Sequence, residues 1–457
     1  MRDKQYIQSK KVFWRQYNDG IVAINHETNE VILLNNSGAA LFSFLIYPRT
    51  IQQVVKFLKD GFNVGANVAP ADAHEFLSSL ILKGFIKTAW KITNSIRDAK
   101  NLQISKSNGD NSKKKYEVMR WAARNLIPIS VQIELTHHCN LHCIHCYLSK
   151  KDSENVPNLL LLEKLFHQLK GAGTLFLTLT GGEPLLYSNL MNVLDIAVLQ
   201  CGFSTTIFTN GTIMRKDWKD IISKYSLKEI HVSLYSLHSD IHDEITGVQG
   251  SQRLTLNFIK QLLDTGTRVV IKSPLFRQTI EEAPSLREYA KELGTEWLGG
   301  PLITPRDDGD IFPTTMRATR KQIISYFQKT EDSLSIKGNI LQDVFGSTGD
   351  SPLACLALSN SCFIDVNGDL YPCSQVRQKI GNVFENQFEK LWHESLMLKR
   401  IREVRLNDLK KCSNCKIIAY CSRCPGLADL EGEDIFDLSP FDCLLAQCRK
   451  EAEKQRN

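Results

Sequence analysis

The chain has 457 residues, a length that allows about three domains. Its apolar fraction of 42% and charged fraction of 23% are ordinary for globular proteins, and the net charge of +6 comes from bases spread among nearly as many acids. Composition therefore gives no reason to expect a nucleic-acid partner. The start of the chain lacks an apolar signal segment and no apolar run is long enough to span a bilayer, so we expect a cytoplasmic protein without a membrane span. In that reducing compartment, the thirteen cysteines are expected to bind metals or clusters rather than to form disulfides.

Residues 1–92 are predicted to form a small α+β domain. Three short antiparallel strands are indicated by the alternating apolar and polar residues of KVFWRQ, GIVAINH and EVILLNN. Helical apolar spacing follows in SGAALFSFLI, TIQQVVKFLKDGF and APADAHEFLSSLILKGF, with Ser37 and Thr50 as candidate N-caps. Such a unit is winged-helix-like, which makes DNA binding an alternative. The last predicted helix carries two acids and a single lysine, a composition that disfavours phosphate contacts.

Residues 93–127 are predicted to be a linker, because they are poor in apolar side chains and include the polar stretch SKSNGDNSKKK. Residues 128–335 then alternate short apolar runs with helical stretches. The predicted strands are ISVQIEL, TLFLTLT, STTIFT, EIHVSLY, RVVIKSP and TEWLGGPLI. A repeating strand–helix order indicates a parallel sheet of the α/β class, and six such units indicate a partial (β/α)6 barrel. In barrels of this type, the chemistry gathers at the C-terminal ends of the strands.

A loop rich in cysteine, THHCNLHCIHCYL, directly follows the first predicted barrel strand. Cys139, Cys143 and Cys146 are spaced C-x3-C-x2-C, and four histidines are threaded between and before them. Three thiolates and one histidine can complete a tetrahedral zinc site. Three thiolates on a cubane cluster instead leave one iron without a protein ligand, and that iron can bind a substrate or cofactor. The loop by itself leaves both alternatives open.

Polar residues also stand at the ends of the next three predicted strands. Gly181, Gly182 and Glu183 lie in the sequence GGEP, where two glycines let backbone amides approach a ligand and a carboxylate can pair with an ammonium. Asn210 ends the third strand and Ser233 the fourth. Because the C-terminal ends of successive strands share one rim, these residues predict a common ligand site.

The C-x3-C-x2-C loop after the first strand and the GGEP segment after the second together resemble the radical S-adenosylmethionine superfamily, over residues from about 128 to 310. The resemblance implies that the three loop cysteines hold a [4Fe–4S] cluster, whose open iron chelates the amino and carboxylate groups of S-adenosylmethionine. It implies that the GGE segment contacts that amino group, and that Asn210 and Ser233 contact the ribose or the carboxylate. The cluster would then cleave the cofactor to a 5′-deoxyadenosyl radical, which takes a hydrogen from an unactivated carbon. We interpret the loop histidines as packing or hydrogen-bonding residues.

Residues 336–457 are predicted to form a cysteine-rich domain, in which few apolar residues are present and bound metal would help to hold the fold. Paired zinc ribbons are one interpretation. The arrangement, which includes GDLYPC and CSNCKIIAYCSRC, resembles the SPASM extension of radical S-adenosylmethionine enzymes, which carries two auxiliary [4Fe–4S] clusters. The ligands that the resemblance implies for the first cluster are Cys355, Cys362, Cys373 and Cys424. Those implied for the second cluster are Cys412, Cys415, Cys421 and Cys443, with Cys448 as an alternative to Cys443.

The N-terminal unit resembles the PqqD-like element that binds leader peptides of ribosomally made precursors, and VILLNNSGAALFSFL is the stretch that matches best. The resemblance implies that an extended leader adds a strand to the exposed edge of the three-stranded sheet, beside an apolar groove along the last helix. Tethering the leader to the barrel would raise the effective concentration of the rest of the peptide at the radical. The partners expected are therefore a precursor peptide and an electron donor such as flavodoxin or ferredoxin.

These features together predict a radical enzyme that matures a ribosomally synthesised peptide. The cysteine loop and the overall layout are similar to maturases of the sactipeptide type, which implies a thioether between a cysteine sulfur and a carbon of another residue. That step would abstract a hydrogen, form the C–S bond and send an electron to an auxiliary cluster. Carbon–carbon crosslinking and epimerisation are alternatives within the superfamily, and a multi-zinc binding or scaffold protein is the alternative from another class.

Overall fold

The structure, a computed structural model, describes residues 4–62, 64–65, 67–90, 108–149, 156–330, 355 and 357–455. Residues 93–107 of the predicted linker and the predicted start of the C-terminal domain at residue 336 lie outside these ranges. The chain divides into two compact units. The first comprises residues 1–122 with 202–204, and the second comprises residues 123–201 with 205–457.

Among the described residues, the first unit contains two small antiparallel sheets and four helices. The sheet expected from the sequence has the order β2–β3–β4, formed by β2 (Val12–Tyr17), β3 (Gly20–Asn25) and β4 (Val31–Leu34). A second sheet, which the sequence did not predict, has the order β5–β1–β6, formed by β1 (Lys4–Gln8), β5 (Arg49–Thr50) and β6 (Ile86–Trp90). The three expected helices are α1 (Asn36–Phe44), α2 (Ile51–Phe62) and α3 (Ala69–Leu82).

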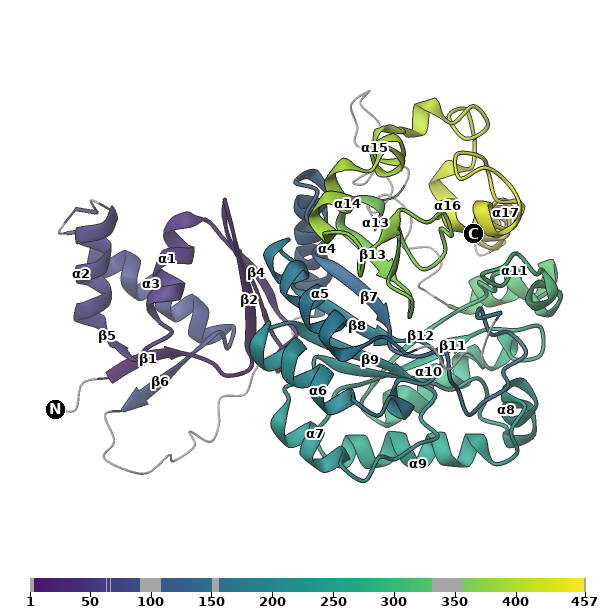
Figure 1. Cartoon of the computed structure of the whole chain (residues 1–457), viewed down its shortest axis with the longest axis horizontal. Helices are drawn as coiled ribbons and strands as arrows, with labels where there is room; N and C mark the ends of the chain where they lie inside the picture. The colour runs from purple at the N-terminus through teal and green to yellow at the C-terminus, as the bar shows by residue number, and fades with distance from the viewer. Residues whose placement is uncertain are drawn as a thin grey trace. The chain divides into compact units, whose positions relative to one another are not determined.

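The core of this unit lies between the three helices and the β2–β4 sheet (Figure 1). Every residue of β3 is buried, because this strand is paired on both edges and its alternate side chains pack against the helices. Phe42 of α1 and Leu77 of α3 meet Ile21 of β3 in one apolar cluster. Strand β4 pairs only with β3 in its sheet, so its other side is an edge where a further strand can be added.

A fourth helix, α4 (Asn108–Arg124), lies within the segment predicted as linker. Its residues Val118, Trp121 and Ala122 share one face, and both Val118 and Ala122 are buried. The Trp121 ring meets the ring of Tyr17 edge-on, with centroids 4.9 Å apart. The apolar spacing that makes this helix is confined to its last turns, because the first part of the segment is a run of polar residues and lysines.

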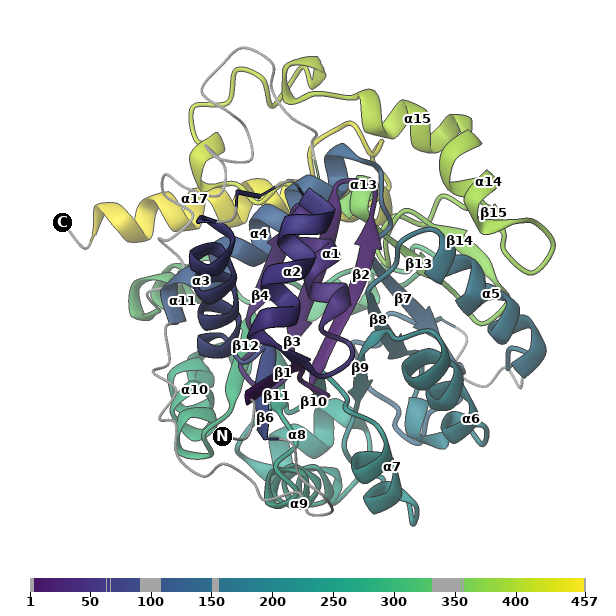
Figure 2. The same ribbon diagram turned by 90° about the vertical axis from the view of Figure 1, so that its left-hand side faces the viewer.

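A nine-stranded sheet organises the second unit, with the order β12–β11–β10–β9–β8–β7–β13–β14–β15. Six consecutive strands of this sheet are parallel and coincide with the six predicted barrel strands. They are β7 (Ser130–Glu134), β8 (Phe176–Thr180), β9 (Ser204–Thr209), β10 (Glu229–Ser233), β11 (Val269–Pro274) and β12 (Glu296–Gly300). The helices that follow around the outside of this curved sheet in Figures 1 and 2 are α5 (Leu159–Gly171), α6 (Leu190–Leu194), α7 (Trp218–Lys224), α9 (Ser251–Asp264) and α10 (Ala283–Glu292). The predicted α/β class and partial barrel are confirmed.

The cysteine-rich C-terminal segment continues the barrel sheet. Strand β13 (Ser361–Ile364) pairs in parallel with β7, and β14 (Asp369–Tyr371) and β15 (Gly381–Asn382) extend the sheet in antiparallel fashion. The helices of this segment are α13 (Ala357–Asn360), α14 (Phe388–Glu394), α15 (Leu396–Glu403), α16 (Pro425–Leu430) and α17 (Pro440–Lys454). The buried indole of Trp392 on α14 donates a hydrogen bond to the carbonyl of Leu126, 2.6 Å away, which anchors the segment just ahead of β7.

The burial of His242 on α8 (Ser239–Thr246) can be tested through the pH dependence of the protein's stability. Its ring is 1% exposed and its Nδ1 accepts a hydrogen bond from the backbone N–H of Tyr235 (3.3 Å). Burial lowers the pKa of His242 from 6.5 to about 4, because the imidazolium form loses its hydration; Asp243 opposes this shift. Between these two pH values the unfolded chain binds a proton that the folded chain does not, so stability is lost as the pH falls.

From pH 7 to pH 5.5, we therefore expect His242 to lower the free energy of unfolding by about 1 kcal/mol. His242→Gln should remove this part of the pH dependence in urea unfolding followed by tryptophan fluorescence. His74→Gln, a change at an exposed position of α3, serves as the matched control and should leave the dependence unaltered. Identical pH slopes for wild-type and His242→Gln protein would contradict the expectation.

Candidate active site and surface groove

The loop that carries the three cysteines leaves the C-terminal end of β7 and is held in place by backbone hydrogen bonds. His142 N–H donates to the carbonyl of Thr246 (2.9 Å), and Ile144 N–H donates to that of Ile245 (3.0 Å), so the end of α8 fixes the middle of the loop. Cys139, Cys143 and Cys146 are all half-buried. The loop therefore lies at the rim of the barrel where the sequence predicted a ligand site.

The two glycines of the GGEP segment allow it to run against the cysteine loop. Gly181 has φ +132°, and a Cβ atom there would lie 2.2 Å from the carbonyl oxygen of Thr136. At Gly182 a Cβ atom would lie 2.4 Å from the carbonyl oxygen of His138. Gly182 N–H donates to Thr136 (2.7 Å) and Glu183 N–H donates to His138 (2.9 Å). We expected the glycines to bring backbone amides to a ligand; in the structure they bring two loops together.

Glu183 joins the ends of β8 and β9. Its side chain is fully buried, and its Oε1 accepts hydrogen bonds from Leu185 N–H (3.0 Å) and the Thr209 hydroxyl (2.8 Å). Its Oε2 accepts one from Asn210 N–H (2.7 Å). Burial raises the pKa of Glu183 to about 7, although the three donors act in the opposite direction. A cation that binds beside this carboxylate would therefore meet a group that is already desolvated.

Asn210 and Ser233 also lie near the cysteine loop. The Asn210 amide nitrogen is 3.8 Å from the Cys139 sulfur and 3.0 Å from the side-chain oxygen of Asn140. Ser233 ends β10, two residues before the buried Tyr235, whose hydroxyl interacts electrostatically with the thiols of the loop. The structure thus gathers all five predicted cofactor-binding residues around one rim.

The sequence analysis missed a buried acid beside the same loop. Glu134, the last residue of β7, is fully buried, accepts a hydrogen bond from the Tyr147 hydroxyl (2.6 Å), and lies 3.0 Å from Nε2 of His137. A carboxylate at the last position of β7, directly ahead of the cysteine loop, was the signal that pointed to it. His145 packs edge-on against Tyr235 and Phe276, with ring centroids 4.7 and 4.8 Å away, as expected for a packing residue of the loop.

The spacing of the loop thiols bears on which metal group fits them. Within the described parts of the chain, no three His, Cys, Asp or Glu side chains converge closely enough to hold a single metal ion. A tetrahedral zinc ion with bonds of about 2.3 Å would need ligand sulfurs about 4 Å apart. In a cubane, each thiolate binds a different iron, so the sulfurs stand further apart. The thiols of Cys139 and Cys146 interact electrostatically across the loop, and three thiolates are the donor set that a cubane with one open iron takes.

The C-terminal cysteines form two groups. The thiols of Cys373 and Cys355 both act electrostatically on Cys424, and Val376 N–H points at the sulfur of Cys373 (3.4 Å). Cys362, predicted to join them, is buried in β13, and the charged group that acts on its thiol is the guanidinium of Arg402.

The second group contains all four of its predicted members, whose thiols interact with one another: Cys412, Cys415, Cys421 and Cys443. Cys448 stands apart from them. It is fully buried beside Arg320, with its sulfur 3.9 Å from the carbonyl oxygen of that residue. The structure therefore favours Cys443 over Cys448 as a member of the second group.

Four arginines that interact with these cysteines carry buried N–H groups. The nitrogen atoms that are buried without a hydrogen-bond acceptor among the described residues are Nε of Arg377, Nη2 of Arg402, Nε and Nη1 of Arg423, and Nε of Arg449. Each of these guanidinium groups interacts electrostatically with at least one cysteine thiol. A buried cation with missing hydrogen bonds is costly, whereas an anionic iron–sulfur cluster would supply both charge and acceptors. The residues present therefore fit auxiliary clusters.

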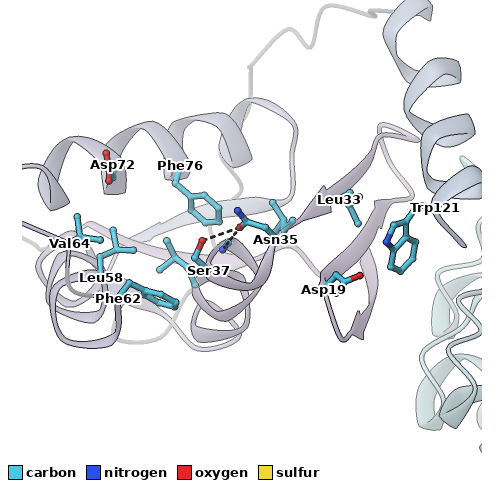
Figure 3. A pocket seen from close by; sticks show the side chains of 13 residues that line it. Asp19, Leu33, Asn35, Ser37, Leu58, Phe62, Val64, Asp72, Phe76 and Trp121 are labelled. Carbon is cyan, nitrogen blue, oxygen red and sulfur yellow. Dashed lines mark hydrogen bonds between the residues drawn. The ribbon is translucent and has the colours of Figure 1, made fainter. Parts of the chain in front are cut away.

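A groove of about 620 Å³ opens within the first unit beside the edge strand β4 (Figure 3). Its lining is mostly apolar and comes from β4 and all four helices of the unit, including Leu33, Leu41, Leu58 and Phe76. Trp121 of α4 stands at one end of it. The groove thus combines an unpaired strand edge with apolar side chains, as the sequence analysis expected for this unit.

Comparison with known families identifies three regions of the chain. Residues 133–290 match the Radical SAM superfamily, residues 355–425 match the iron-sulfur cluster-binding domain SPASM, and residues 20–86 match coenzyme PQQ synthesis protein D, PqqD. Radical SAM, SPASM and PqqD domains are therefore all present in the chain, and the PqqD domain precedes the radical SAM domain in the sequence. Its radical SAM domain binds S-adenosylmethionine and a [4Fe–4S] cluster, and its SPASM domain binds auxiliary iron–sulfur clusters.

Individual relatives are distant. The chain is 26% identical over 306 residues to the antilisterial bacteriocin subtilosin biosynthesis protein AlbA of Bacillus subtilis, covering 65% of this chain and 67% of that protein. It is 23% identical over 337 residues to an AdoMet-dependent heme synthase of Methanosarcina barkeri, covering 69% of this chain and 96% of that protein. The crystal structure of Streptococcus suis SuiB bound to precursor peptide SuiA has a TM-score of 0.62 at 19% identity, covering 96% of this chain and 99% of that one. Within the described residues, no helix is both long enough and apolar enough to cross a membrane.

Proposed function

We propose that this protein matures a ribosomally synthesised precursor peptide by forming a thioether between a cysteine sulfur and a carbon of another residue. The observation that carries the proposal is the groove on the edge of β4, because it gives a radical enzyme a place to hold an extended peptide. The name of AlbA refers to the biosynthesis of a bacteriocin, and SuiB was crystallised with a precursor peptide. We place the enzyme in the cytoplasm, where reducing conditions keep its thiols available for clusters.

For the radical site, we assign Cys139, Cys143 and Cys146 as ligands of the [4Fe–4S] cluster that S-adenosylmethionine joins. When bound, the cluster and S-adenosylmethionine together supply the radical that removes hydrogen from the peptide. In this proposal Glu183 receives the ammonium of the methionine moiety. Its Oε2 accepts one hydrogen bond where a carboxylate oxygen can accept two, so one acceptor position is left for that group.

The other rim residues orient the cofactor and the loop. Asn210 sits between the Cys139 sulfur and the end of β9, where its amide can reach a ribose or carboxylate oxygen. Ser233 ends β10 and is proposed to do the same from the next strand. The close backbone pairing of Gly181 and Gly182 with the cysteine loop keeps this set of donors together.

The proposed ligands of the first auxiliary cluster remain Cys355, Cys362, Cys373 and Cys424, and those of the second Cys412, Cys415, Cys421 and Cys443. The charged group that acts on the Cys362 thiol is Arg402, one of the buried arginines that an anionic cluster would neutralise. In thioether formation, the carbon radical left by hydrogen removal would bond to the cysteine sulfur with release of the thiol proton to a base or water and of one electron, which clusters within the same unit would accept. An external one-electron donor such as flavodoxin or ferredoxin is proposed to reduce the radical-site cluster.

Co-expression with a candidate precursor encoded beside the gene, followed by mass spectrometry, tests the function. A thioether predicts a loss of two mass units together with one cysteine that no longer reacts with iodoacetamide. A loss of two units with every thiol still alkylated would mean carbon–carbon crosslinking, and altered stereochemistry at unchanged mass would mean epimerisation. Either result would replace the proposed bond while leaving a peptide-modifying radical enzyme.

Metal content separates this proposal from a multi-zinc scaffold. Protein purified without oxygen should contain about twelve irons per chain, four for each of three cubanes, and show a reducible brown chromophore. Colourless protein with stoichiometric zinc would refute the proposal that this protein is a radical enzyme.

A further inference from the structure

Acidic but not basic side chains line the groove in the first unit, among the described residues. Asp19 and Asp72 are the charged side chains among the described residues that line it, and both are exposed. In Figure 3 they stand at opposite ends of the row of apolar side chains, with Phe62 and Phe76 on the side of Asp72 and Leu33 on the side of Asp19. Neither carboxylate forms a salt bridge with another described residue. The groove therefore presents an apolar middle between two acidic ends.

Strand β4 offers the backbone along which an occupant would lie. It runs from Val31 to Leu34 at the edge of its sheet, and the Leu33 side chain is 48% exposed. An extended peptide paired with this edge would turn alternate side chains toward the groove. Large apolar side chains of that peptide would meet Leu58 and Phe76, and the residues flanking them would reach the two carboxylates.

Helix α4 adds a wall that lies outside the residues matching PqqD. Trp121 lines the groove and rests on Tyr17, while Lys114 pairs with Glu30 across 4.0 Å. A second, smaller groove of about 270 Å³ is also lined by Leu33 and Phe76, and its charged lining residues are Lys83, Lys114 and Glu117. Basic side chains thus line the second groove but not the first, along the same strand edge, among the described residues.

We propose that this groove selects an extended peptide segment in which large apolar side chains are flanked by lysine or arginine, and that Trp121 closes one end over it. The proposal rests on the proposed function in taking the occupant to be the leader of the precursor peptide. Charge complementarity with Asp19 and Asp72 selects the flanking residues, and the edge of β4 supplies the backbone hydrogen bonds. Recognition therefore uses α4 as well as the PqqD domain.

Three synthetic probes test this selection with the full-length protein. Each is a fluorescein-labelled peptide of twelve residues with alternating leucines in the centre and two lysines, two glutamines or two glutamates at each end. Fluorescence anisotropy should show the lysine probe binding about tenfold more tightly than the glutamate probe, since each exposed charge pair contributes a factor of up to about five. The difference should shrink in high salt.

Matched variants test whether the two carboxylates cause the preference for the lysine probe. In Asp19→Asn/Asp72→Asn protein, the three probes should bind alike, with the affinity for the glutamine probe unchanged. Asp60→Asn, which removes a carboxylate on α2 that pairs with Lys56, should keep the preference of the wild type. Trp121→Ala should weaken all probes by roughly fivefold or more, and Trp121→Phe should recover most of that loss.

The outcomes separate this inference from the proposed function. Equal binding of the lysine and glutamate probes by wild-type protein overturns the charge selection. Binding of no probe while a co-expressed precursor is still modified also overturns it and leaves the proposed function standing. Binding of no probe together with an unmodified precursor counts against both.

Discussion

Replacing Cys139 with alanine should abolish cleavage of S-adenosylmethionine. Cys139 lies at the centre of the rim, near the Asn210 amide and interacting with the thiol of Cys146. Its loss leaves two thiolates, so a second iron lacks a protein ligand and the cluster is no longer held in the loop. We expect formation of 5′-deoxyadenosine under dithionite to fall by more than about 100-fold, the upper range for changes that disturb only outer-shell groups. Chromatography of anaerobic assays and iron analysis measure both effects.

Cys201→Ala provides the control for this experiment. Cys201 is also buried in the second unit, but it stands at the start of the turn before β9 and outside both cysteine groups. We expect this variant to retain its iron and its rate of 5′-deoxyadenosine formation. Wild-type rates from Cys139→Ala protein would show that the loop does not hold the catalytic cluster.

The second large effect concerns the auxiliary clusters. In Cys443→Ala protein, we expect peptide modification to be lost, iron content to drop by about four atoms per chain, and cleavage of S-adenosylmethionine to continue. The reason is that the Cys443 thiol interacts with those of Cys412 and Cys415, which it would join in binding one cluster. Iron analysis, electron paramagnetic resonance and mass spectrometry of the peptide report these three properties separately.

Cys448→Ala is the matched comparison, because this cysteine is only five positions further along α17. Its sulfur lies near Arg320 and away from the other thiols, so the variant should keep its iron and its peptide-modifying activity. Loss of a cluster from Cys448→Ala with retention in Cys443→Ala would reverse the assignment.

Local sequence pattern was sufficient for the barrel and for part of the N-terminal unit. Each of the six parallel strands is a short apolar run bounded by turns, and the cysteine loop and GGEP follow β7 and β8 as expected. Thr50 exchanges hydrogen bonds with Gln53 at the start of α2, as predicted for an N-cap. The prediction of Ser37 for α1 was wrong, because Asn35 accepts the hydrogen bond from Gly38 N–H and Ser37 donates to Asn35 instead.

Long-range contacts were beyond the reach of local patterns. Strand β13 is four residues long and pairs with β7, which lies more than two hundred residues earlier. The periodicity of the sequence near β13 therefore does not indicate its partner strand. The same limit applies to Cys362. Its spacing resembles that of a ligand, and its role as a ligand stays a prediction. The pairing of β13 with β7 and the position of its thiol near Arg402 on α15 could not be read from that spacing.

The buried arginines beside the C-terminal cysteines have a consequence for biogenesis. Arg402 and Arg423 are each 8% exposed and have N–H groups without an acceptor among the described residues, so a chain that has received no iron carries buried guanidinium groups whose hydrogen bonding is incomplete. Folding of this segment and delivery of its inorganic cofactors are therefore thermodynamically linked. A cell short of iron or sulfide would accumulate a C-terminal segment open to proteases, and the enzyme pool would be set by the supply of clusters as well as by translation.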